Sequence, residues 1–107
     1  MSPDLLHNLL VQIKKDLLTL YGGRLFGVYL YGSYARGDQD DQSDLDIMII
    51  LENFDQYGEE IDRTSELISN LSLEYGVSIS TVFLERQDWL EANTPLLRNV
   101  RVDAVPV

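Results

Sequence analysis

The spacing of hydrophobic residues changes several times along the chain, and each change marks an expected element. Leucine and isoleucine recur at helical spacing after Pro3, until Gly22-Gly23 ends this first predicted helix. The apolar and aromatic run from Phe26 to Tyr31 predicts a first strand. The run from Leu45 to Leu51, which is apolar except for Asp46, predicts a second strand. We expect this strand to be buried on both faces apart from its first carboxylates.

The second half of the chain predicts another helix and a third strand. Apolar side chains recur at helical spacing from Glu59 to Tyr75, and Gly76 closes this helix. The segment from Val77 to Leu84 alternates in polarity and is rich in β-branched residues, as a strand is. A short helix is expected from Gln87 to Ala92, whereas the state of the remaining tail stays open.

The connections between these elements predict the fold class. The polar stretch from Gly32 to Ser43 contains one expected turn of helix, Ser33 to Arg36, and then an exposed loop. Such a short connection allows the first two strands to pair antiparallel, while the long helix allows the third strand to join in parallel. We therefore expect an α/β (α+β) fold with a small mixed three-stranded sheet flanked by helices, formed as a single domain by residues 1–107.

Composition then narrows the partners. The chain carries 18 acidic and 8 basic residues, with a net charge of −10. This acidity argues against direct nucleic-acid binding, which needs clustered Lys and Arg. It either attracts basic protein partners or simply keeps the protein soluble, and both interpretations stay open. With no cysteine, one helical histidine (His7) and no apolar run of roughly 20 residues, we expect a cytoplasmic protein without thiol chemistry, a histidine relay or a membrane span.

Candidate chemistry is concentrated between the first two predicted strands. Asp44 and Asp46 lie two residues apart where the second strand begins, so their side chains converge on one face. Adjacent carboxylates repel unless a cation lies between them, and Mg²⁺ suits such a site when phosphate oxygens complete its coordination. Gly32-Ser33 ends the first strand, where backbone N–H groups and a hydroxyl can hold a polyphosphate. Capping of the strand is the alternative explanation for Asp44.

The arrangement of these motifs resembles a known family. Gly32-Ser33, a ten-residue spacer and Asp44-Leu45-Asp46, with Ala35-Arg36-Gly37 inside the spacer, resemble the signature of the DNA polymerase beta-type nucleotidyltransferase superfamily. The chain length and the amino-acid sequence around the motif resemble those of its minimal nucleotidyltransferases (MNT), the antitoxins paired with HEPN-domain toxins. The resemblance extends from about Leu5 to Trp89.

This resemblance implies roles for five residues. Asp44 and Asp46 would be catalytic and would bind Mg²⁺, while Gly32, Ser33 and Arg36 would bind ATP. Arg36 has an equally good alternative as the ion-pair partner of Asp38 or Asp44. Many members of the superfamily carry a third carboxylate on the strand after the second helix, and in this chain the matching residue is Ser80.

The leading hypothesis is therefore a Mg²⁺-dependent protein adenylyltransferase that acts as an antitoxin. It would transfer AMP from ATP to a tyrosine of a cognate HEPN ribonuclease toxin and so neutralise it. Ser80 favours an alternative, a catalytically weak module that neutralises its partner by occlusion. A subunit that modifies a small molecule is a third hypothesis, which the lack of an acceptor domain disfavours. Apolar Trp89, Leu96, Leu97 and Val100 form either a docking face or part of the core.

Overall fold

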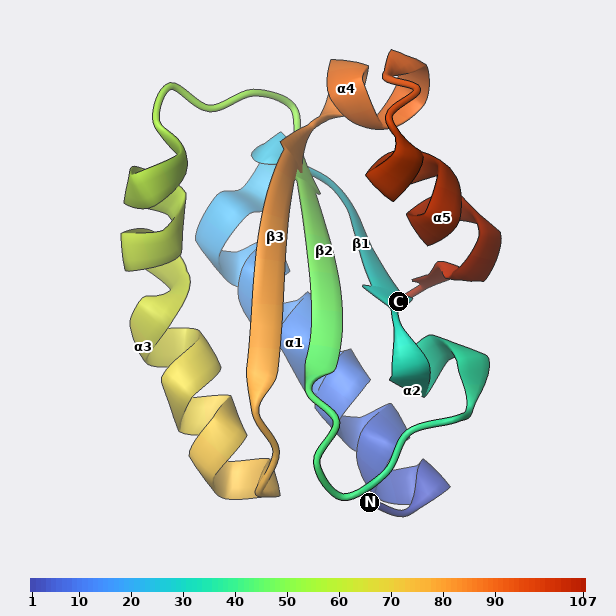
Figure 1. Cartoon of the computed structure of the whole chain (residues 1–107). Coiled ribbons are helices and arrows are strands. Elements are labelled where there is room, and N and C mark those ends of the chain that lie inside the picture. Colours follow the sequence, from blue (N-terminus) through green and yellow to red (C-terminus); the bar gives the residue numbers. More distant parts are fainter.

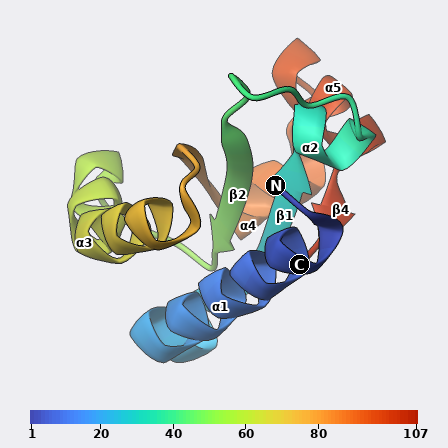
Figure 2. The same cartoon turned by 90° about the horizontal axis from the view of Figure 1, so that it is seen from below.

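The computed structural model describes all residues, 1–107, as one sheet with helices on both faces (Figures 1 and 2). The elements follow one another as α1 (Pro3–Tyr21), the 3-10 turn η1 (Gly22–Arg24), β1 (Leu25–Tyr31), α2 (Ser33–Arg36), β2 (Leu45–Leu51), α3 (Tyr57–Tyr75), β3 (Ile79–Glu85), α4 (Arg86–Glu91), α5 (Pro95–Asp103) and β4 (Val105–Pro106). None of the helices combines the length and apolar character that crossing a membrane requires.

The sheet confirms the predicted pairing and adds one strand to it. Its order is β3-β2-β1-β4, with β1 antiparallel to β2 and β3 parallel to β2. The expectation of three strands was one short, because Val105–Pro106 pairs antiparallel with β1 at Tyr29 and Leu30. A two-residue strand that contains proline has no alternating pattern, so only its place beside β1 identifies it.

Two apolar clusters enclose the sheet and explain why β2 is buried. On one face, α1 and α3 supply residues such as Leu9, Ile13 and Leu71, which pack against alternate residues of the strands. On the opposite face, Leu97 and Val100 of α5 pack against the other set of β2 side chains. Figure 2 shows α1 and α3 on one side of the sheet and α5 on the other. From Ile47 to Leu51 every β2 side chain is buried, as predicted.

The C-terminal tail, whose state the sequence left open, forms helix α5. The Thr94 hydroxyl accepts a hydrogen bond from the backbone N–H of Leu97 at 3.2 Å, and Pro95 occupies the first helical position. The buried residues of α5, Leu97 and Val100, are three apart and therefore lie on one face. This face covers β2, and the chain then returns to the free edge of β1.

A buried carboxylate joins α1 to α3. Glu60 is only 2% exposed and accepts a hydrogen bond from the Tyr21 hydroxyl at 2.7 Å. Arg63 lies 2.9 Å from the same carboxylate, and Arg24 lies 3.7 Å from its other oxygen. The cost of burying this charge is offset by its two cationic neighbours and the hydroxyl, so the cluster is a structural tie between the helices.

Candidate nucleotide and metal site

The turn after β1 has the shape of an anion-binding element. The Gly32 carbonyl accepts hydrogen bonds from the N–H groups of Ala35 and Arg36, both at 3.1 Å. The short helix α2 ends at Gly37, which has a left-handed conformation with φ +80°. The N–H groups of Ser33 and Tyr34 belong to the first turn, where a helix offers no internal acceptor. These N–H groups and the Ser33 hydroxyl are therefore donors that could hold a phosphate.

Gly32 lies directly against Asp46 of β2. Its φ is +75°, and a Cβ placed on it would come within 2.2 Å of the Asp46 Oδ2 atom. The antiparallel register pairs Tyr31 with Asp46, which brings the end of β1 beside the start of β2. The two halves of the predicted motif, separated by a ten-residue spacer, thus meet at one edge of the sheet.

The carboxylate of Asp46 has an unfavourable electrostatic environment. It is half-buried, and burial raises its pKa above the ordinary value, with the charge of Asp44 as a second cause. The positive charge of the Arg36 guanidinium lowers the pKa of Asp46 and so partly offsets these two effects. On the facing strand, burial and then the Asp46 charge raise the pKa of the Tyr31 hydroxyl. A cation between the carboxylates would relieve this repulsion.

Asp44 is exposed at the end of a structured loop. The Asp40 carboxylate accepts a hydrogen bond from the Gln42 N–H at 2.8 Å, and the Ser43 hydroxyl accepts one from the Asp40 N–H at 3.0 Å. The loop is fixed to the next strand where the Leu45 N–H donates to the Ser78 carbonyl at 2.8 Å. Asp44 also lines a polar cavity of about 520 Å³ between the N-terminus of α1 and the end of α3.

The donor set fits a hard divalent cation that is shared with a substrate. Two adjacent carboxylates are the type of ligand that Mg²⁺ prefers, and phosphate oxygens and water usually complete its octahedron. No group of three or more Asp, Glu, His or Cys side chains in the chain is arranged so that it could hold a metal ion. The parallel register instead places Ser80, which is exposed, beside Asp46. This side of the site therefore has a hydroxyl rather than a carboxylate.

Arg36 is paired with carboxylates outside the aspartate motif. Its Nε lies 3.1 Å from Asp38 and its Nη1 lies 3.3 Å from Asp103. Of the alternatives open from the sequence, the structure has the Asp38 pair and not the Asp44 pair. Asp103, at the end of α5, was not foreseen, because 67 residues separate it from Arg36 and no local pattern links them.

The apolar residues considered as a docking face are divided between core and surface. Leu97 and Val100 are buried, whereas Leu96 is 61% exposed. Trp89 is half-buried, and its ring centroid lies 4.7 Å from that of Tyr29. These contacts make three of the four residues part of the packing between α4, α5 and the sheet.

Comparison with known proteins agrees with this geometry. The family model described as "Nucleotidyltransferase domain" matches residues 10–107. The chain belongs to this family. A relative from Methanocaldococcus jannaschii that is named as a protein adenylyltransferase is 35% identical over 75 residues, which make up 70% of this chain and 75% of the relative.

Solved structures of this nucleotidyltransferase fold are also similar to the chain. One is the crystal structure of a toxin-antitoxin with AMP-PNP, at 25% identity and a TM-score of 0.63, covering 90% of this chain and 69% of that one. Another is a structure of the tri-AMPylated Shewanella oneidensis HEPN toxin in complex with its MNT antitoxin. That match has 21% identity and a TM-score of 0.55, covers 92% and 70% of the two chains, and bears on the fold alone.

Proposed function

We propose that this nucleotidyltransferase is a Mg²⁺-dependent protein adenylyltransferase that acts as an antitoxin on a HEPN-family partner. The observation that carries the proposal is the close approach of Gly32 to Asp46, which supports a site where the turn after β1 binds phosphate beside the aspartates. The similarity to an M. jannaschii relative named for this activity supports the reaction class. The similarity to a toxin-antitoxin structure with AMP-PNP supports both the nucleotide and the partner class.

The reaction follows from the chemistry of the site. A tyrosine oxygen of the partner attacks the α-phosphate of ATP, the bond from that phosphorus to the bridging oxygen breaks, and pyrophosphate leaves with the electron pair. The phenolic proton passes to solvent or to a base of the partner. Bound Mg²⁺ would supply charge stabilisation for this transfer. Asp44 and Asp46 would hold the metal ion, Gly32 and Ser33 would orient the β- and γ-phosphates, and Arg36 would add a positive charge.

Ser80 favours one second candidate, neutralisation of the partner by occlusion without transfer. A serine beside Asp46 cannot deprotonate an acceptor as a carboxylate can, so this chain contributes no evident base on that strand. In the adenylyltransferase proposal the partner or solvent must accept the proton. In the occlusion proposal no proton moves, and the acidic surface of this chain covers the basic surface of a ribonuclease.

One experiment separates the two candidates. The chain and its co-expressed partner are incubated with ATP labelled at the α-phosphate, and label on the partner is measured beside the partner's ribonuclease activity. Replacing Asp44 and Asp46 by Asn is expected to abolish labelling and to restore ribonuclease activity. The matched control replaces Asp55 and Asp62 by Asn, which removes the same charge from exposed positions elsewhere.

The outcomes are distinct. Labelling that persists in the Asp44/Asp46 variant contradicts the metal-site assignment. Neutralisation that persists without labelling selects occlusion. Circular dichroism of both variants checks that the fold is retained, which we expect because Asp44 is exposed and Asp46 is half-buried.

A further inference from the structure

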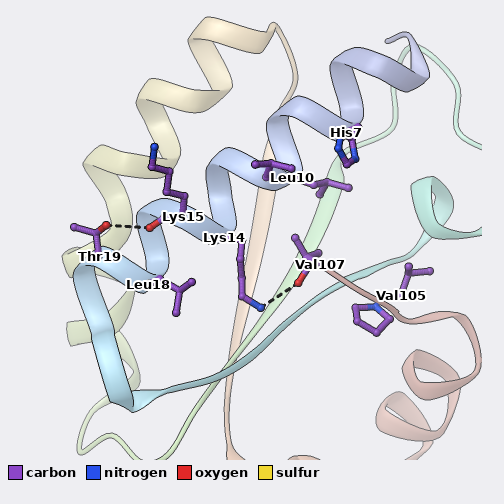
Figure 3. A pocket seen from close by; sticks show the side chains of 10 residues that line it. His7, Leu10, Lys14, Lys15, Leu18, Thr19, Val105 and Val107 are labelled. Carbon is purple, nitrogen blue, oxygen red and sulfur yellow. Dashed lines mark hydrogen bonds between the residues drawn. The ribbon is translucent and has the colours of Figure 1, made fainter.

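A groove unlike the rest of the surface runs along α1. Its floor and walls come from α1 residues between His7 and Thr19 and from the C-terminal residues 105–107, and its volume is about 760 Å³ (Figure 3). None of the five proposed site residues lines it, so it is separate from the nucleotide site.

The groove is apolar where it is open to solvent. Val11 is 52% exposed, Leu18 is 47% exposed and Val105 on the opposite wall is 46% exposed. Val11 and Leu18 are seven residues apart on α1 and therefore lie on one face. This outward face is additional to the buried face of α1 formed by Leu9, Ile13 and Leu17. Helix α1 thus has two apolar faces, and the fold covers only one of them.

The charge around the groove is the reverse of the charge of the chain. The protein carries 18 acidic residues, yet no Asp or Glu lines the groove. Both lysines of the chain, Lys14 and Lys15, line it together with the single histidine, His7. The Lys14 ammonium donates a hydrogen bond to the Val107 carbonyl at 3.0 Å, which holds the C-terminal wall against α1 (Figure 3).

We infer that this groove docks an amphipathic helix of a partner protein whose apolar stripe is flanked by acidic residues. The twelve residue steps from His7 to Thr19 give the groove a length of about 18 Å, enough for about three turns of helix. A concave apolar channel accepts a convex helical stripe, and a cationic rim selects an acidic flank. An anionic membrane fits less well, since a membrane surface is flat whereas this surface is a groove. This inference does not depend on the proposed enzymatic function.

Two peptides of roughly fourteen residues test the inference, a length that spans the groove. Both carry leucines at helical spacing; one has glutamates on both sides of the stripe and the other has lysines there. Fluorescence anisotropy with the full chain is expected to give at least about tenfold tighter binding of the glutamate peptide, because the lysines attract its glutamates and repel the lysines of the other peptide. The difference is expected to shrink as salt is added.

Variants of the groove locate the binding. Replacing Val11 and Leu18 by Glu is expected to weaken binding of the glutamate peptide by about tenfold or more, because two apolar contacts are lost. The matched control, Leu73→Glu with Val102→Glu, adds the same charge at positions that are 81% and 83% exposed on other helices, and it is expected to bind like the wild type. Lys15→Glu is expected to favour the lysine peptide instead.

Several results would overturn the inference. These are equal or absent binding of the two peptides, equal loss of binding in the groove and control variants, and binding of the chain to anionic vesicles through Val11 and Leu18. Self-association that sedimentation detects and that the Val11/Leu18 variant abolishes would assign the groove to a second copy of this chain.

Discussion

The close approach of Gly32 to Asp46 allows us to predict how much stability is lost when one methyl group is added at Gly32. In Gly32→Ala, the new Cβ would lie 2.2 Å from Asp46 Oδ2 and 3.1 Å from its Cγ, so the carboxylate must move. Displacing a side chain from its rotamer costs about 0.5–1.5 kcal/mol. The backbone at Gly32, with φ +75° and ψ −155°, lies in a region that is essentially restricted to glycine, and this adds about 1–3 kcal/mol. The expected loss of unfolding free energy is therefore about 1.5–4.5 kcal/mol.

Gly37→Ala is the matched control for this substitution. Gly37 also has a positive φ, +80°, but a Cβ there meets no atom within 4 Å. Its expected cost is the left-handed backbone alone, about 1–2 kcal/mol. Urea denaturation of both variants without Mg²⁺ gives the two values. We expect Gly32→Ala to lose AMP transfer as well, because the displaced carboxylate is a proposed metal ligand, whereas Gly37→Ala retains it.

A double-mutant cycle isolates the contact itself. In an Asp46→Ala background the two carboxylate oxygens are absent, so Gly32→Ala should cost about 0.5–1.5 kcal/mol less than in the wild type. The reasoning is refuted if Gly32→Ala costs the same in both backgrounds. It is also refuted if Gly32→Ala is no more destabilising than Gly37→Ala.

Three further predictions concern the electrostatics of the chain. Because burial and Asp44 raise the pKa of Asp46 in the folded state, the contribution of Asp46 to the stability of the metal-free protein should fall as pH rises from acid towards neutral. Asp46→Asn should therefore be the more stable protein at neutral pH and lose this advantage in acid, as urea unfolding at each pH will measure; an unchanged difference would contradict it. Ser80→Asp places a third carboxylate beside Asp46 and should tighten Mg²⁺ binding in calorimetric titration, whereas Ser80→Asn should not. Tyr21→Phe removes the 2.7 Å hydrogen bond to the buried Glu60 and should cost about 1.5–3 kcal/mol in urea unfolding; a loss below this range would mean that the arginines alone satisfy the carboxylate.

Elements with a strong local signal were predicted from the sequence with their ends. Strand β2 begins and ends at Leu45 and Leu51 as expected, because this run is apolar except for Asp46 and is bounded by Asp44 and Glu52. The single turn from Ser33 to Arg36 was also predicted, since Gly32 and Gly37 supply the positive φ values at both ends. The predicted start of α3 is two residues late, and β3 starts two residues and ends one residue later than predicted, as is usual at element boundaries.

Features that depend on distant parts of the chain were not predictable. The pairing of β4 with β1 arises only after α5 has packed on the sheet, and the ion pair between Arg36 and Asp103 arises from the same return of the chain. The groove on α1 was missed for a related reason. Periodicity shows that α1 is amphipathic, but it does not show that Val11 and Leu18 remain uncovered after the core has formed.

The ion pairs of Arg36 indicate how much of the site is preformed. The Gly32 turn, the Asp40–Ser43 loop and the register of β1 with β2 are all fixed by backbone contacts in the free protein. Arg36 alone would have to change partners to reach a phosphate, since Asp38 and Asp103 hold it at 3.1 Å and 3.3 Å. Both pairs are solvent-exposed, and such pairs contribute little, so a phosphate can replace them at small cost. Asp103 is the last residue of α5. Replacement of Asp103 by a phosphate as the partner of Arg36 would therefore also break the one ion pair between α2 and α5, the helix that covers β2.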